Sequence, residues 1–215
     1  MPALFRLGLA AALLAALAVP ASAQISVGAK AGLNTAFFSG DDADLTDDGE
    51  NDASPRLGFV GGLTGRFPLN PTVALQLEAL YAQKGGVYEN SRGVDEVTKL
   101  DYLEIPASVR FGVPLSPLLD AGVSVGGYVG VPLRGRIEVD GDRATDPELN
   151  TDYGALVGVD VGSGPFYLEG RYALGLTDAI DFDEVLGDDV DKKNQVVSFT
   201  LGYRFGGAAP RGRRY

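Results

Sequence analysis

The chain has 215 residues and a formal net charge of −11, with 30 glycines, 12 prolines and no cysteine, histidine or tryptophan. The absence of cysteine excludes disulfides, thiol nucleophiles and thiolate metal sites, and the absence of histidine removes the commonest general base and metal ligand. The negative charge argues against a nucleic-acid partner. These exclusions predict a protein that is not an enzyme and that uses no cofactor or metal.

The first 23 residues are typical of a signal peptide. A basic start at Arg6 is followed by an apolar run over 7–19 and by Ala-Ser-Ala ending at Ala23, the small-residue pattern of a cleavage site. The run is too short for a membrane anchor, which is the alternative interpretation. We therefore predict a signal peptide over 1–23, cleavage between Ala23 and Gln24, and export from the cytoplasm.

Eight segments of the mature chain alternate apolar and polar side chains with a period of two, as strands with two different faces do. From Leu103 to Phe111 the odd positions are Leu, Ile, Ala, Val and Phe, and the even positions are Glu, Pro, Ser and Arg. None of the eight has helical periodicity, and no later run is long and apolar enough for a transmembrane helix. The predicted strands are 25–38, 56–67, 72–84, 98–111, 118–139, 151–161, 166–176 and 195–205.

The connections between these strands alternate in length. Three short connections are rich in proline or glycine, whereas four long ones contain 21 of the 29 acidic residues. The short connections are 68–71, 112–117 and 162–165. The long connections are 39–55, 85–97, 140–150 and 177–194. Short turns at one end and long loops at the other are typical of an outer-membrane barrel, whereas a soluble barrel has no reason to sort its loops in this way.

The polar face of the predicted strands carries five basic and five acidic residues, and the apolar face carries no charge. The charged residues are Lys30, Arg66, Glu78, Glu104, Arg110, Asp120, Asp160, Glu169, Arg171 and Arg204. Since Arg or Lys at the bilayer midplane costs about 2–4 kcal/mol, an uncharged face is what lipid requires. We expect the ten charges to pair across a narrow lumen in a structural network. The alternative, a catalytic or ion-conducting lumen, has no evident nucleophile, base or access path.

Aromatic residues lie near both ends of the apolar face. Four phenylalanines adjoin the short-turn end, and two tyrosines lie toward the long-loop end, as in the aromatic girdles of membrane barrels. These residues are Phe67, Phe111, Phe166, Phe205, Tyr81 and Tyr153. A lipocalin-like soluble barrel, with the apolar face turned inward around a ligand, is the competing interpretation and leaves these positions unexplained.

The predicted fold is all-β: an eight-stranded antiparallel up-and-down transmembrane β-barrel over residues 24–205, with short periplasmic turns and long extracellular loops. Eight strands enclose room for side chains and not for an open pore. The even strand number returns both ends of the barrel to the periplasm. A basic tail over 206–215 follows, which we predict to be disordered in the periplasm.

Five stretches of the sequence resemble the PorT-type outer-membrane β-barrel domain proteins of Bacteroidetes-like bacteria. They are 75–85 (LQLEALYAQKG), 100–110 (LDYLEIPASVR), 152–159 (DYGALVGV), 168–176 (LEGRYALGL) and 194–205 (NQVVSFTLGYRF). The resemblance implies an eight-stranded barrel in the outer membrane, mostly without a defined activity, and its namesake takes part in protein secretion and maturation. The last strand ends on Phe205, like the signal read by barrel-assembly machinery, although here a basic tail follows it.

Two local features carry smaller predictions. The acidic loop 40–52 begins like a calcium-binding loop at Asp42 and Asp44, but the ligand spacing then breaks at Thr46, so a solubilising loop is the favoured interpretation. Pro106 stands in mid-strand without the N–H of a ladder hydrogen bond, so we expect a bulge or locally weakened pairing there.

The predicted function is that of an integral outer-membrane protein with a structural or surface-interaction role and a lumen filled by side chains. The alternatives are a narrow porin or passive channel and an accessory factor in protein secretion or outer-membrane assembly. Expected partners are outer-membrane lipid and, through the last strand, the barrel-assembly machinery. The sequence identifies no extracellular partner for the loops.

Overall fold

The computed structural model describes residues 25–39, 53–89, 95–139, 142–145, 149–178 and 193–205. These ranges contain nine strands and no helix. The strands are β1 (Ser26–Ser39), β2 (Ala53–Pro68), β3 (Val73–Glu89), β4 (Asp95–Pro114), β5 (Leu119–Val139), β6 (Asp142–Thr145), β7 (Asp152–Ser163), β8 (Phe166–Asp178) and β9 (Lys193–Phe205). Within the described ranges, no helix is long and apolar enough to cross a membrane.

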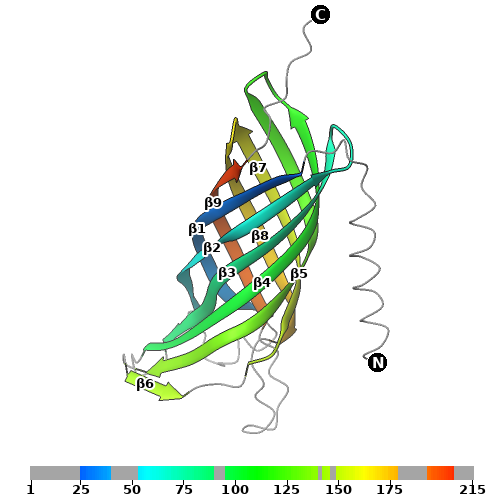
Figure 1. The fold of residues 1–215 in the computed structure, drawn as a ribbon. Coiled ribbons are helices and arrows are strands. Elements are labelled where there is room, and N and C mark those ends of the chain that lie inside the picture. The colour runs from blue at the N-terminus through cyan, green and yellow to red at the C-terminus, as the bar shows by residue number, and fades with distance from the viewer. Residues whose placement is uncertain are drawn as a thin grey trace, which may run out of the picture.

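Eight of the strands form a closed antiparallel barrel (Figure 1). Each barrel strand pairs with its neighbour along the chain, and β1 pairs with β9 from Val27 with Phe205 to Ser39 with Lys193, which closes the sheet. The short strand β6 pairs only with the outer end of β5 and takes no part in the closure. The predicted eight-stranded up-and-down barrel is confirmed.

The strands are strongly inclined to the barrel axis. Following the paired residues once around the barrel from Ser26 leads through each strand in turn and ends at Ala36, ten residues further along β1. A stagger of this size tilts the strands and sets the width of an eight-stranded barrel. The interior is therefore wide enough for one layer of side chains from each wall.

Three tight turns lie at one end of the barrel, together with the start of β1 and the end of β9 (Figure 1). In the β2–β3 turn the Asn70 side chain accepts hydrogen bonds from the backbone N–H groups of Thr72 and Val73, at 2.9 and 2.8 Å. In the β7–β8 turn Gly164 adopts a φ of 58°, which side chains disfavour. We call this end the turn end and the opposite one the loop end.

At the loop end, two strands continue well beyond their predicted ends, and one short strand is additional. β3 runs to Glu89 and β4 starts at Asp95, so most of the predicted loop 85–97 is paired strand, and β6 lies within the predicted loop 140–150. Gly85, taken as the start of a loop, has a φ of 119° and passes so close to β4 that a Cβ atom would lie 2.0 Å from the Thr98 carbonyl oxygen. The glycine thus lets the strand continue, and that part of the loop prediction was wrong.

Pro106 causes no bulge. The register between β3 and β4 is the same on both sides of it, from Leu77 with Ala107 to Leu80 with Glu104, although the two intervening pairs are not formed. On its other side Pro106 pairs with Tyr128. The missing N–H therefore weakens one ladder without shifting it. The register shift in β4–β5 lies elsewhere, next to Asp101 and Tyr102.

The two faces of each strand differ as their alternation predicts. In β7 every second residue is buried along the whole strand. The residues predicted for the apolar face point outward: Val157, for example, is 46% exposed and Leu168 is 64% exposed. The barrel therefore presents an apolar outer surface, and its core is the lumen.

Candidate functional site in the barrel lumen

All ten charged residues predicted for the polar face point into the barrel. Seven of them are buried, and Arg66, Asp120 and Arg204 are partly exposed near the turn end. The strand period places them inside, because each falls on the opposite parity to the outward apolar residues of its strand. The side chains are stacked in three layers along the barrel axis, which we call the turn-end, middle and loop-end tiers.

The turn-end tier is a chain of arginines and aspartates. Arg110 binds both carboxylate oxygens of Asp160, with Nη2–Oδ1 and Nε–Oδ2 distances of 2.7 Å, and also reaches Asp120 at 2.9 Å. Arg204 approaches Asp120 at 3.4 Å, and Arg66 approaches Asp160 at 3.7 Å. Bidentate pairs such as Arg110–Asp160 combine strength with fixed geometry, so this tier braces β4 against β7 across β5.

The middle tier is a ring of two cations and two anions. Lys30 binds Glu78 at 2.9 Å and Glu169 at 3.2 Å, and Arg171 binds the same two carboxylates at 2.8 and 2.6 Å. All four side chains are at most 7% exposed. They come from β1, β3 and β8, none of which are neighbours, so the ring links strands across the lumen.

The loop-end tier surrounds one buried ammonium group. Lys84 Nζ lies 2.5 Å from Glu104 and 2.9 Å from Asp152, and 4.4 Å from the centre of the Tyr128 ring. Asp152 also accepts hydrogen bonds from the Tyr128 hydroxyl at 3.2 Å and from Asn194 at 3.1 Å. Burial of this cation is offset by two carboxylates and an aromatic face.

Lys84 and Asp152 are lumen residues that sequence reasoning missed. Lys84 is the last residue of one predicted strand and Asp152 the second residue of another, each beside a long connection, and so neither was counted with the lumen charges. Their parity was the available signal: Lys84 continues the series Gln76, Glu78 and Leu80 along β3. With these two residues, the lumen charges whose side chains the structure describes number six basic and six acidic, and they remain balanced.

Apolar side chains fill the lumen between the middle and loop-end tiers. Ala36, Tyr128, Leu156, Ala173 and Val196 pack together in one buried cluster. The polar face was expected to hold charges among small and polar residues, so this cluster was not anticipated. A cavity of about 20 Å³ remains beside the middle tier, which is room for one water molecule.

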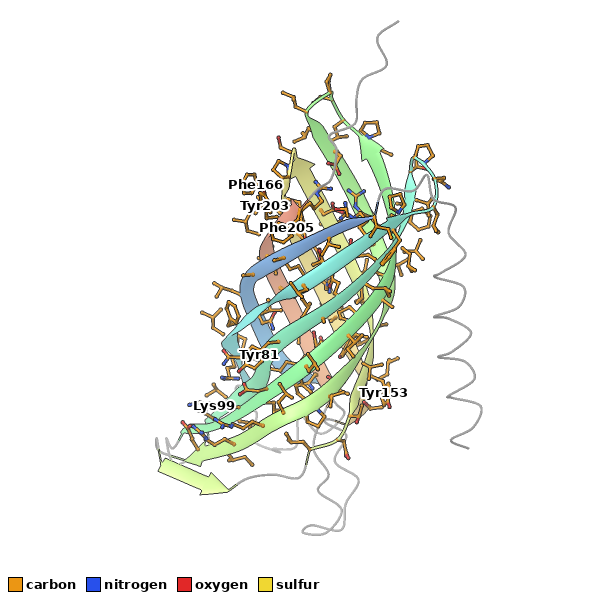
Figure 2. The ribbon with its side chains drawn as sticks, viewed as in Figure 1. Tyr81, Lys99, Tyr153, Phe166, Tyr203 and Phe205 are labelled. Carbon is orange, nitrogen blue, oxygen red and sulfur yellow. The ribbon has the colours of Figure 1, made fainter. Side chains whose placement is uncertain are left out.

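Figure 2 shows four of the predicted girdle residues on the outside of the barrel, Phe166 and Phe205 toward the turn end and Tyr81 and Tyr153 toward the loop end. At the turn end Phe166 and Phe205 flank Tyr203, with ring centres 5.1 Å apart on both sides, and the sequence prediction omitted Tyr203. Phe111 is exposed and Phe67 is half-buried nearby. Toward the loop end, Tyr81 and Tyr153 point outward from β3 and β7 (Figure 2).

Several sequence predictions concern residues outside the described ranges. They are the signal peptide with its cleavage between Ala23 and Gln24, the acidic loop 40–52 and the tail 206–215. Within the described part of the chain, no group of three or more acidic residues is arranged to hold a metal ion.

The sequence matches the family of the outer membrane protein beta-barrel domain over residues 20–181. The chain belongs to this family. It is an outer-membrane β-barrel protein of bacteria, and its apolar outer surface contacts lipid. By the general layout of such barrels, the turn end faces the periplasm and the loop end the cell exterior.

Several solved structures are similar to the chain at low sequence identity. Ail, the attachment invasion locus protein of Yersinia pestis, is 16% identical, with 84% of this chain and 98% of that chain covered and a TM-score of 0.46. Neisserial surface protein A is 14% identical, with 85% and 99% covered and a TM-score of 0.48. OprG of Pseudomonas aeruginosa is 13% identical, with 86% and 98% covered and a TM-score of 0.47. No curated protein matches the sequence.

Outside the lumen, the outer-membrane barrel carries charged side chains on the extracellular ends of β4 and β5. Glu138 accepts a hydrogen bond from Lys99 at 2.6 Å and one from Arg136 at 3.4 Å. The hydrogen bond from Lys99 holds the pKa of Glu138 below its usual value, and the charges of both cations act in the same direction. The carboxylate is therefore ionised throughout the neutral range.

Lowering the pH should break the ion pair between Lys99 and Glu138. A lowered pKa in the folded state means that the stabilisation is complete above the pKa of the unfolded chain and is lost as the pH falls through the lowered value. We expect carboxyl ¹³C NMR of the folded barrel in detergent to show a Glu138 midpoint below the usual value of about 4.3. Glu138→Gln assigns the signal by removing it. A midpoint at or above the usual value would show that Lys99 does not hold the carboxylate in solution.

Proposed function

We propose that this protein is a closed barrel with a structural or surface-interaction role, and that it neither conducts solutes nor catalyses a reaction. The observation that carries the proposal is the middle tier, in which four buried side chains join across the full width of the lumen. The tiers on either side add further blocks of paired charges. The acidic extracellular connections are then the part of the molecule that meets other molecules.

The chemistry of the lumen supports the non-enzymatic part of the proposal. The sequence has no histidine or cysteine, and each carboxylate of the middle tier is held by two cations. A general base needs a free lone pair within reach of a substrate proton. Carboxylates that are buried and paired in this way serve a structural network better than proton transfer.

Planar-bilayer recording tests the closed lumen. We expect the purified protein, inserted into a lipid bilayer in concentrated potassium chloride, to give no conductance steps, because a desolvated ion would have to displace paired charges. A protein of known porin activity, inserted in the same bilayers, serves as the control. Reproducible unit steps from this protein would contradict the closed lumen and favour the alternative, a narrow porin or passive channel.

We also propose that the chain is a PorT-type member of the barrel family and that its last strand is bound by the barrel-assembly machinery. The stretch Leu-Asp-Tyr-Leu-Glu-Ile-Pro over 100–106 supports the first point, and the outward aromatic Phe205 at the end of β9 supports the second. PorT-type membership raises an accessory role in protein secretion or membrane assembly as the second candidate. Co-purification from outer membranes tests the accessory role. If the protein is an accessory factor, secretion components should co-purify with it. The Phe205→Ala variant, once folded, should still retain them.

A further inference from the structure

The basic side chains that the structure describes occupy two places. Six of them lie in the lumen, as described above. The remaining four whose side chains the structure describes are Arg56, Lys99, Arg134 and Arg136. All four lie at the extracellular ends of β2, β4 and β5, and Lys99, Arg134 and Arg136 point outward from the paired strands β4 and β5. The chain has a net charge of −11, so a cluster of positive charge at this place is a candidate binding site for an anion.

The patch places like charges directly opposite each other. Lys99 on β4 pairs across the ladder with Arg136 on β5. The neighbouring pair on the same outer face, on the side toward the membrane, is Asp101 with Arg134. Like charges at directly opposite positions destabilise a sheet unless an anion lies between them. Glu138 provides one carboxylate for both Lys99 and Arg136, and Arg134 has no ion-pair partner among the described residues.

The cations of the patch are more exposed than the carboxylate that holds them. The side chains of Lys99 and Arg136 are 37% and 34% exposed, whereas that of Glu138 is 16% exposed. At the edge of the patch Arg56 donates a hydrogen bond to the Lys84 carbonyl oxygen and lies within electrostatic reach of Asp101 and Glu138. The described side chains thus contribute four positive and two negative charges, and three of the cations, Lys99, Arg134 and Arg136, face outward.

The patch begins where the lipid-facing surface ends. Tyr81, in the extracellular girdle, pairs with Leu103, and Asp101 is the next outward residue of β4 after Leu103, followed by Lys99. Figure 2 shows Lys99 just beyond Tyr81 at the same side of the barrel. Tyrosines of a girdle mark the level of the lipid headgroups, so the patch lies at or immediately outside that level.

We propose that this patch, formed by Arg56, Lys99, Arg134 and Arg136, binds the phosphate of a lipid headgroup in the outer leaflet. Guanidinium groups match phosphate oxygens in pairs, and basic residues next to a membrane attract anionic headgroups strongly. A lipid is favoured over a soluble anion because Lys99, Arg134 and Arg136 project sideways from the barrel wall, toward the headgroup layer. Binding adds negative charge to a patch in which the cations outnumber the two carboxylates, Asp101 and Glu138.

Native mass spectrometry of the detergent-solubilised full chain, titrated with purified rough lipopolysaccharide, tests the proposal. The test variant is Lys99→Ala/Arg134→Ala/Arg136→Ala. The matched control is Arg211→Ala/Arg213→Ala/Arg214→Ala, which removes the same charge from the tail. Each basic residue near an anionic lipid surface contributes about fivefold. We therefore expect at least tenfold weaker binding for the test variant and no comparable change for the control.

A second variant tests the same site in the opposite direction. Glu138→Gln removes the competing carboxylate and keeps all four cations, so it should bind lipopolysaccharide more tightly than the unmodified chain. Dephosphorylated lipopolysaccharide should bind weakly to every variant. The heat-dependent shift on gels reports whether each variant has folded. If the triple variant does not fold, the comparison of Glu138→Gln with the unmodified chain tests the proposal.

Three results with the triple variant, its control and phosphate would overturn the proposal, and so would one result with Glu138→Gln. One is equal binding by the unmodified chain and the triple variant, and another is an equal loss in the tail control. The third is displacement of the lipid by millimolar inorganic phosphate, which would make the patch a site for a soluble anion. Glu138→Gln binding more weakly than the unmodified chain would likewise contradict the role given to the cations.

Discussion

Replacing Glu78 with methionine should lower the free energy of unfolding by about 3–5 kcal/mol, the usual cost of removing one partner from a buried ion pair. The substitution leaves Lys30 and Arg171 on the single carboxylate of Glu169, inside a lumen where neither cation can reach bulk water. The measurement is a urea titration of the barrel folded in detergent, with the folded fraction read from the heat-dependent gel shift.

The double substitution Lys30→Met/Glu78→Met should recover most of that loss. It restores neutrality and leaves the Arg171–Glu169 pair, whose Nη2–Oε1 distance is 2.6 Å. Well-packed apolar residues often replace a buried pair at little or no cost. A matched control is Asp120→Asn, whose side chain is 34% exposed at the periplasmic mouth, and which should cost less than about 1 kcal/mol.

The opposite pattern would refute the coupling. If Glu78→Met unfolds at the same urea concentration as the unmodified protein, the middle tier contributes little to stability. If the double variant is as unstable as the sum of its two single variants, Lys30 and Glu78 act independently. Either result would remove the main support for a lumen held shut by paired charges.

Placing arginine at Val157 should destabilise the barrel by about 2–4 kcal/mol, the cost of a basic side chain at the bilayer midplane. Val157 points outward at the centre of β7 and is 46% exposed to lipid in the folded barrel. The experiment compares unfolding of Val157→Arg and the unmodified chain in lipid vesicles, where the hydrocarbon core has its full thickness.

Depth provides the control for this prediction. Leu176 also points outward and is 61% exposed, but it lies near the extracellular end of β8, so Leu176→Arg should cost only about 0–1 kcal/mol. Equal costs at both positions would mean that the outer surface does not face a hydrocarbon layer. A stabilising Val157→Arg would support the soluble barrel, in which that face would not lie in lipid.

The two-residue period of the sequence was sufficient to predict the strands and the two faces of each strand. A strand repeats every two residues, so the parity of Leu103, Ile105 and Val109 against Glu104 and Arg110 decides which side chains share a face, whatever their neighbours are. The alternation of short and long connections then predicted the closed antiparallel order. Both inferences use information that is local along the chain.

The local pattern failed at the strand ends. Gly85 carries the signal of a loop, yet β3 continues through it because β4 lies alongside and supplies the pairing. For the same reason Lys84 and Asp152 were left out of the lumen network. Whether a residue beside a connection is inside the barrel depends on how far its neighbouring strand extends, and that strand is distant in sequence.

The sequence by itself determined the architecture, the outer surface and the balance of lumen charge, because all three follow from alternation and counting. Only the tertiary structure decided which charges meet. Lys30, Glu78 and Glu169 belong to β1, β3 and β8, and the stagger of the closed sheet brings them to one height. The same closure aligns Lys99 with Arg136 on the outer wall. Contacts of this kind depend on the register between paired strands, which cannot be determined from the sequence of one strand alone.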